Sequence, residues 1–230
     1  MQQTNNKKAL VVGATGLIGN QLLDLLLETD YYVEVRVLVR KPLGRKHPRL
    51  VEVVYDFKKP EKEAVIGDDI FCCLGTTMKK AGSKEAFYAV DYEYPLQTAR
   101  IALTNGATQY LIVTAMGANP ESTFFYNRVK GEVEEDLRSL GYRGLHILRP
   151  SLLLGNRTEK RLGERIGEAF MRFFEPVLVG PLKKYKSIES GKVARAMALL
   201  AQKNEKGIFI HESTELQSYE GTTANPQSNR

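Results

Sequence analysis

The sequence predicts an α/β protein with a Rossmann-type, doubly wound parallel sheet. As far as Pro150, strand-like apolar runs alternate with segments of helical spacing, the pattern of a parallel sheet with helices on both faces. The apolar runs are nearly continuous, as expected of strands buried on both sides. The first run also ends in a glycine-rich turn, LVVGATGLIGN, that opens a helix. In such folds the ligand lies beyond the carboxyl ends of the strands.

The expected strands and helices follow one another in order along the chain. Apolar, largely β-branched runs between turn residues predict strands, and apolar residues at helical spacing predict helices. The expected strands are Lys8–Gly13, Val33–Arg40, Leu50–Asp56, Ile70–Gly75, Gln109–Gly117 and Gly144–Pro150. The expected helices are Leu17–Glu28, Lys84–Gly106 and Tyr126–Gly141, and the last two end at a glycine, which suits a helix C-terminus.

After Ser151 the alternation gives way to helical segments at Arg161–Gly180 and Lys192–Gln202 and a short strand at Gly207–His211. We predict one NAD(P)-binding domain over residues 1–212, in which residues 151–187 form a small substrate or lid lobe. Residues 213–230 are polar, and we expect them to form a disordered tail.

The composition is ordinary for a soluble globular protein, with a net charge of +6. No apolar run approaches the roughly 20 residues of a membrane span, and the polar N-terminal residues lack the apolar stretch of a signal peptide. The adjacent Cys72 and Cys73 indicate a buried strand rather than a disulfide. We therefore expect a cytoplasmic protein. His47, His146 and His211 are far apart in the sequence and have no Cys or second His at metal-ligand spacing, so we predict no metal site.

The opening glycines predict a binding site for a dinucleotide. Gly13 permits a tight exit from the strand, Gly16 lets the backbone approach a pyrophosphate, and Gly19 lets the helix pack against the sheet. The amino end of the helix then presents free N–H groups to the anion. The alternative is a turn that binds nothing, because glycines at these spacings also occur by chance.

The end of the second strand favours NADP(H) over NAD(H). A free ribose 2′-hydroxyl usually meets a carboxylate there, but no Asp or Glu lies between Val35 and Val51. Arg40 and Lys41 occupy the tip instead, and a guanidinium suits the 2′-phosphate in charge and geometry. The alternative is a loop that is merely basic.

A weaker nucleotide signal follows the fourth strand, in CCLGTT. The glycine brings backbone close to the adenosine half of a dinucleotide, so Leu74 and Gly75 are expected to line that part of the cleft. The same residues would also make an ordinary loop.

Three further residues predict proton chemistry at the same edge of the sheet. Tyr126 and Lys130 lie four residues apart and share one face of a helix. A neighbouring ammonium favours the phenolate and so lowers the pKa of a tyrosine, which makes the phenol a usable acid or base near neutral pH. Thr114 ends the fifth strand, and its hydroxyl is expected to hydrogen-bond a substrate carbonyl.

These features together resemble the short-chain dehydrogenase/reductase superfamily and, more narrowly, its atypical branch of Tat-interacting oxidoreductases. The matching stretches are CCLGTT, KAG, VDYEY, MGA, YNRVKGEVE and LRPSLLLGNR, between about Lys8 and Arg161. The resemblance implies that NADPH binds across the glycine loop at Thr15, Gly16, Leu17 and Ile18. It also implies cofactor contacts at Arg40, Lys41, Leu74, Gly75, Tyr126, Lys130, Leu153 and Arg161.

The family commonly has two serines where this chain has Thr114 and Ala115. The threonine keeps a hydroxyl, whereas the alanine loses one if the second serine is the one that acts. The mechanism that the resemblance implies is hydride transfer from the nicotinamide to a carbonyl, with Tyr126 as proton donor and Lys130 tuning Tyr126 and holding the nicotinamide ribose.

Three function classes follow. The first is an NADP(H)-dependent oxidoreductase acting on an unidentified small carbonyl or alcohol. The second is a cofactor-sensing regulatory protein that engages a protein partner without turnover; the stretch Ile166–Gly180 could be its partner-binding face, a lid or core. The third, a nucleic-acid binder, rests on net charge alone, because we find no recognition helix or stacking platform. We expect no nucleic-acid partner and no membrane span.

Overall fold

The computed structural model describes residues 6–154 and 186–219, and they form a seven-stranded parallel sheet. The strand order is β3-β2-β1-β4-β5-β6-β9. The order in which strands are added reverses between β1 and β4, and Rossmann folds bind their ligands at this switch point. The predicted fold class is therefore confirmed. The strands are β1 Lys8–Val12, β2 Glu34–Val39, β3 Leu50–Val54, β4 Asp69–Cys72, β5 Gln109–Val113, β6 Gly144–Arg149 and β9 Gly207–Glu212.

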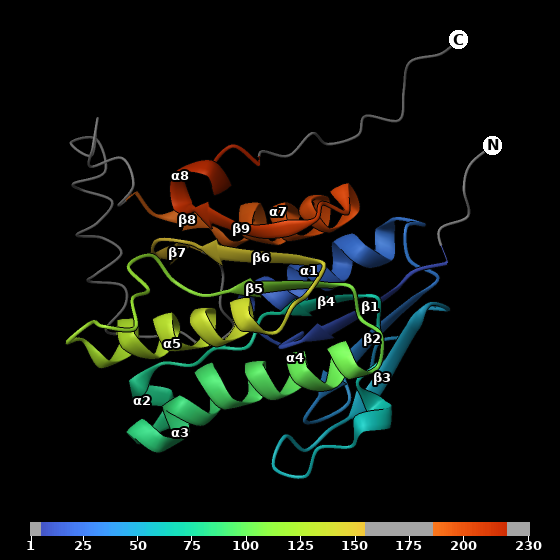
Figure 1. Ribbon diagram of the computed structural model, residues 1–230. Helices are drawn as coiled ribbons and strands as arrows, with labels where there is room; N and C mark the ends of the chain where they lie inside the picture. Colours follow the sequence, from blue (N-terminus) through green and yellow to red (C-terminus); the bar gives the residue numbers. More distant parts are fainter. Residues whose placement is uncertain (1–5, 155–185, 220–230) are drawn as a thin grey trace.

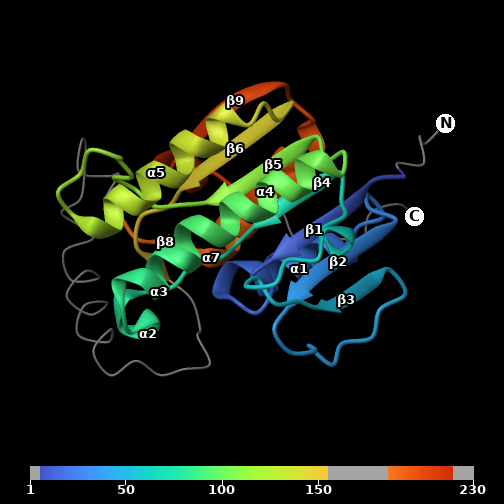
Figure 2. The ribbon, with the colours of Figure 1, turned by 60° about the horizontal axis from the view of Figure 1, so that its bottom comes forward.

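Helices cover both faces of the sheet (Figures 1 and 2). Helices α1 (Leu17–Glu28) and α7 (Ser190–Lys203) pack on one face, where Leu22 and Met197 join Val11 in one apolar cluster. Helices α4 (Tyr94–Thr104) and α5 (Phe125–Ser139) pack on the other, against Ile112. Burial on both faces explains why the strands are almost continuously apolar. Shorter elements are η1 Lys62–Ala64, α2 Met78–Ala81, α3 Lys84–Tyr88, β7 Leu153–Leu154, β8 Ile188–Glu189 and α8 Ser213–Leu216.

The helix expected over Lys84–Gly106 contains a π-helical turn, η2, at Ala89–Glu93. Pro95 lies in the first turn of α4 and lacks the N–H that would bond the carbonyl of residue 91. A wider turn relieves the clash between the proline ring and that carbonyl. The π turn turns Asp91 inward, where its side chain is 1% exposed.

One other expectation needs correction. The tail was expected to be disordered from Ser213, but Ser213–Leu216 form α8, and Ser213 and Leu216 are buried against the domain. His146 and His211, which are far apart in the sequence, lie on adjacent strands, and their ring nitrogens are 3.1 Å apart. Within residues 6–154 and 186–219, no group of three candidate metal ligands comes together.

The described part of the chain contains no helix that is both long and apolar enough to cross a membrane. Cys72 is buried in β4 and both cysteines are free thiols, as the sequence predicted. The lobe predicted over residues 151–187 falls mostly outside the described residues. Leu153, near its start, lies beside Ile188, the residue after its end, in the parallel pair β7–β8.

Candidate functional site

The glycine loop lies between β1 and α1, at the carboxyl edge of the sheet. Gly13 has φ +84°, a conformation that only glycine adopts freely, and a methyl group on it would lie 2.5 Å from the carbonyl oxygen of Cys73. A methyl group on Gly19 would lie 2.2 Å from the carbonyl oxygen of Gly13. Gly13 therefore allows the loop after β1 to approach the loop after β4, and Gly19 allows α1 to approach the backbone of the glycine loop.

The amino end of α1 has the features of an anion site. Gly16 precedes the helix and has no side chain to cap it, and the first turn carries no acidic residue. The first N–H groups of a helix have no acceptor within it, so they are available to a phosphate. Of the other residues expected here, Thr15 is exposed, Leu17 is half-buried and Ile18 is buried.

The loop after β4 forms the opposite wall. Its backbone touches Gly13, Leu74 is half-buried and Gly75 is exposed. Burial raises the pKa of both thiols, of Cys72 and of Cys73, so neither presents a thiolate to the site. This wall offers backbone and apolar surface rather than charge.

The basic residues after β2 fall into two groups. Arg40 and Lys41 are exposed, and neither has a hydrogen bond or ion pair with any described residue. In contrast, Arg45 pairs with Asp24 at 2.5 Å, and Arg49 donates to the carbonyl of Tyr32 at 3.0 Å. Lys46 is exposed as well and has no such partner among the described residues. Arg40 and Lys41 differ from it in their place, because they leave β2 beside the glycine loop, where Val12 of β1 lies opposite Leu38 of β2.

Tyr126 and Lys130 lie on the first turns of α5 and differ sharply in exposure. The tyrosine is 39% exposed, and its ring lies 5.7 Å from that of Phe87. The lysine is 4% exposed, and its Nζ lies 2.8 Å from Oδ1 of Asp91. A methyl group on Gly75 would lie 4.0 Å from the same Nζ, so the ammonium sits directly beneath the loop after β4.

The charge of Lys130 survives its burial. Burial by itself lowers the pKa of this ammonium, but the negative charge of Asp91, with a smaller effect of Tyr126, outweighs it and raises the pKa above its ordinary value. Lys130 is therefore a cation at neutral pH, one helical turn from a partly exposed phenol. This is the arrangement that the sequence predicted for proton transfer.

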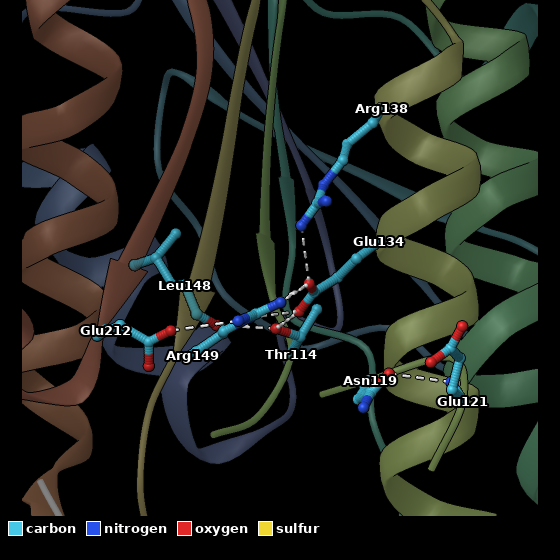
Figure 3. Close-up of polar contacts among 8 residues, drawn as sticks. All are labelled: Thr114, Asn119, Glu121, Glu134, Arg138, Leu148, Arg149 and Glu212. Carbon is cyan, nitrogen blue, oxygen red and sulfur yellow. Dashed lines mark hydrogen bonds and ion pairs between the residues drawn. The ribbon is translucent and has the colours of Figure 1, made fainter. Parts of the chain in front are cut away.

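Thr114 follows β5 but has a different partner from the one expected (Figure 3). Its hydroxyl donates to Oε1 of Glu134 at 2.6 Å and also lies 3.3 Å from the carbonyl of Leu148. A hydroxyl has one proton to donate, so Thr114 cannot donate to a substrate carbonyl while this bond exists. In this conformation the hydroxyl is directed to Glu134, so its contact with a substrate carbonyl stays a prediction, and Ala115 beside it offers no hydroxyl.

Glu134 is the centre of a buried charged network that joins α5 to the sheet. Its carboxylate accepts from Nε of Arg149 at 3.1 Å, and Arg138 approaches it at 3.5 Å. Arg149 also pairs with the partly exposed Glu212 of β9 at 3.2 Å. Thr114 is thus a structural residue of this network, which fixes α5 and with it the Tyr126–Lys130 pair.

The sequence interpretation missed the two carboxylates that matter most here, Asp91 and Glu134. Glu134 could have been found, because it lies four residues after Lys130 on the same helical face. Asp91 lies in the quoted stretch VDYEY, but only the π turn directs it inward. Of the cofactor contacts implied by resemblance, Leu153 is half-buried in β7, and Arg161 lies outside the described residues.

Comparisons with known proteins agree with this picture. No family model matches the chain. Protein HTATIP2 of Rattus norvegicus is 35% identical over 72% of this chain and 70% of its own length. Protein FMP52 of Eremothecium gossypii is 35% identical over 91% of this chain and 96% of its own.

Solved structures share the fold at low identity. MoeE5 in complex with UDP-glucose and NAD superimposes with a TM-score of 0.66 and 14% identity, over 88% of this chain and 74% of its own. The UDP-glucose 4-epimerase of Thermotoga maritima superimposes with a TM-score of 0.64 and 18% identity, over 88% of this chain and 75% of its own.

The relatives overturn one expectation. The FMP52 proteins of several fungi, including Saccharomyces cerevisiae at 30% identity, carry names that describe them as mitochondrial. The prediction of a cytoplasmic protein, which rested on a polar N-terminus and free cysteines, is therefore wrong. Neither feature distinguishes the cytoplasm from other compartments that keep thiols reduced.

Proposed function

The chain belongs to the atypical short-chain dehydrogenase/reductase family of HTATIP2 and FMP52, and we propose that it binds NADP(H) and transfers hydride between this cofactor and a small carbonyl or alcohol. The observation that carries the proposal is the placement of Lys130, one helical turn from Tyr126, beneath the loop after β4, and this loop meets the glycine loop. A proton donor and a dinucleotide-binding site then lie at the same edge of the sheet.

The residues at this edge fit a dinucleotide. Gly13, Gly16 and Gly19 would hold the pyrophosphate on the amino end of α1, with Thr15, Leu17 and Ile18 around it. Leu74 and Gly75 would line the adenosine side. NAD in the complex of MoeE5 supports a nicotinamide dinucleotide as the ligand class. When bound, the nicotinamide supplies the hydride, and the protein supplies orientation and charge.

The choice of NADP(H) rests on Arg40 and Lys41. Both cations are exposed and unpaired within the described chain, beside the glycine loop. A 2′-phosphate would give them the anionic partner that they lack, through charge-assisted hydrogen bonds. The free hydroxyl of NAD(H) would give them nothing comparable.

In the proposed reaction Tyr126 donates a proton to the carbonyl oxygen of the substrate in reduction and accepts it in oxidation. The cationic Lys130 stabilises the phenolate that remains and, by the family resemblance, binds the nicotinamide ribose. Thr114 is not part of this proposal, because its hydroxyl is bonded to Glu134. Tyr126 therefore provides the hydroxyl donor to the substrate oxygen.

The test is NADPH oxidation at 340 nm over a panel of aldehydes, ketones and quinones. The proposal predicts turnover of at least one class, and loss of that turnover in Tyr126→Phe with NADPH binding retained. Tyr88→Phe is the matched control, since Tyr88 ends α3 and its ring packs against that of Tyr92. Turnover that survives unchanged in Tyr126→Phe overturns the proposed chemistry.

A second candidate function is NADP(H) sensing without turnover. Ala115 in place of a serine and the bond from Thr114 to Glu134 favour it, because they leave the substrate oxygen fewer donors. The same panel discriminates between the two. Tight NADPH binding with no turnover of any carbonyl favours the sensor.

A further inference from the structure

A buried ion pair joins the elements around the candidate site. Nζ of Lys130 lies 2.8 Å from Oδ1 of Asp91, and the two side chains are 5% and 1% exposed. Oδ2 of Asp91 accepts from the backbone N–H of Thr76 at 2.9 Å, so the same carboxylate also ties down the loop after β4. One aspartate therefore connects the π turn, the cofactor loop and the helix that carries Tyr126.

A buried ammonium keeps its proton only where an anion stabilises it. Among the residues that the structure describes, Asp91 is the one carboxylate in ion-pair contact with Lys130. Cys72 of β4 and Tyr126 of α5 also act on this lysine, but burial raises the pKa of the thiol and keeps it neutral. Glu134, one turn further along α5, is held by Arg149.

We propose that Asp91 is a positioning residue that keeps Lys130 protonated and fixed beneath the loop after β4. The π turn directs this carboxylate inward, and such turns are frequent at functional sites. Without Asp91, burial favours a neutral lysine, which attracts neither a phenolate nor a nucleotide. Only the consequence for hydride transfer rests on the proposed function; the charge state of Lys130 does not.

The direct test follows the ionisation of Lys130 by NMR in the full chain labelled with 13C- and 15N-lysine, and Lys130→Met identifies its signal. In the wild type the lysine stays charged to high pH. The asparagine of Asp91→Asn has the same shape as the aspartate and still accepts from the N–H of Thr76. In this variant the midpoint of the Lys130 titration falls by about two pH units or more. A midpoint in Asp91→Asn equal to that of the wild type overturns the proposal.

Asp69→Asn is the matched control. It removes a buried carboxylate from another lysine pair, Lys7–Asp69 at 2.9 Å, at the opposite end of the sheet. The midpoint of Lys130 stays in place in this variant. If Asp69→Asn shifts it as far as Asp91→Asn does, the effect is a general loss of structure and the proposal fails.

A stability measurement decides the matter if Asp91→Asn folds poorly. Removing one partner of a buried pair leaves an uncompensated charge, whereas removing both does not. The double variant D91N/K130M therefore unfolds at higher urea concentration than D91N alone. A double variant no more stable than D91N contradicts the charge-compensating role.

The proposed reaction supplies a last readout. In Asp91→Asn, turnover falls as pH rises through the new midpoint of Lys130, while the wild type keeps its turnover over that range. If the wild type turns over no substrate, the proposed function fails, yet the NMR titration still decides the role of Asp91.

Discussion

The two ends of the parallel sheet each hold a lysine paired with a buried aspartate, and the two pairs differ in how many groups support them. At the amino end, Asp69 accepts from Lys7 at 2.9 Å, from the hydroxyl of Tyr32 at 2.8 Å and from Nε2 of Gln109 at 2.7 Å. Lys7 itself is 18% exposed and also donates to Asn204. This pair is one part of a large network, and water can reach its cation.

At the carboxyl end of the sheet, the buried aspartate has fewer partners. Among the residues that the structure describes, Asp91 contacts Lys130 and accepts from one backbone N–H, and the lysine is almost completely buried. Tyr126, one turn away, is partly exposed, unlike Tyr32 at the other end. Burial, and then the charge of Asp69, raises the pKa of Tyr32 far above its ordinary range, so that phenol is a permanent hydrogen-bond donor.

The difference shows that a buried lysine–aspartate pair can serve either the stability of the fold or the chemistry of a site. Many partners around a carboxylate fix a structure, because the loss of any one leaves the others in place. A single partner in a sealed position makes the charge of the lysine depend on one residue, next to a phenol that a ligand can reach. We infer that the amino end holds the sheet together and the carboxyl end carries the chemistry.

The largest expected effect separates the two tyrosines. Tyr126→Phe lowers turnover of the best carbonyl substrate by about 10²- to 10⁴-fold, the usual contribution of a general acid. Tyr32→Phe leaves the turnover of the folded protein unchanged and lowers the free energy of unfolding by about 1.5–3 kcal/mol, since it removes a buried hydrogen bond to a charged group. Steady-state rates and urea titrations measure both, and a reversed pattern would break the comparison.

The next effect concerns stability at the carboxyl end. Glu134→Gln breaks a buried ion pair with Arg149 and lowers the free energy of unfolding by about 3–5 kcal/mol. Glu212→Gln, which removes the partly exposed partner of the same arginine, changes it by less than about 1 kcal/mol. Equal losses in urea denaturation would show that burial does not distinguish the two partners.

A smaller effect tests the unpaired cations. In the double variant Arg40→Ala, Lys41→Ala, the Kd for NADPH rises by about 10- to 100-fold, while that for NADH stays the same. Arg45→Ala removes a nearby cation that is already paired with Asp24, and it leaves both constants unchanged. Calorimetry at low salt measures the four values. Equal weakening of NADPH and NADH would remove the assigned contact with the 2′-phosphate.

The smallest effect lies between the two ends, at His146 in the middle of β6. Burial, with the nearby His211 and Lys203, lowers the pKa of His146 to about 4. The unfolded chain binds this proton near the ordinary value of 6.5, so stability falls as the pH drops from about 6.5 towards 4. Between pH 7 and pH 5 the wild type loses about 1–2 kcal/mol more than His146→Leu in urea denaturation. Parallel losses would mean that this histidine is protonated in the folded state.

The sequence was sufficient for features that depend on local pattern. The strands, the glycine loop and the Tyr126–Lys130 spacing were predictable because each is a short-range periodicity with a known geometric outcome. The hydrogen bond from Thr114 to Glu134 was not predictable in this way, because the acceptor is twenty residues away and reaches the hydroxyl only through the packing of α5.

The remaining surprises also depend on contacts between distant residues. Asp91 faces inward through a π turn that the pattern of an ordinary helix does not contain. His146 and His211 meet because β9 adds to the sheet beside β6. The helix that begins at Ser213 looks polar, yet Leu216 is completely buried when the domain folds over it.

The most direct test of the central claim is an amide NMR titration of the full, glycine-labelled chain with NADPH. The glycines mark both ends of the sheet: Gly13, Gly16, Gly19 and Gly75 at the carboxyl end, and Gly67, Gly144 and Gly207 at the amino end. Our account predicts that NADPH shifts the signals of the first group and leaves those of the second in place. Shifts confined to the second group, or none at millimolar NADPH, would contradict it.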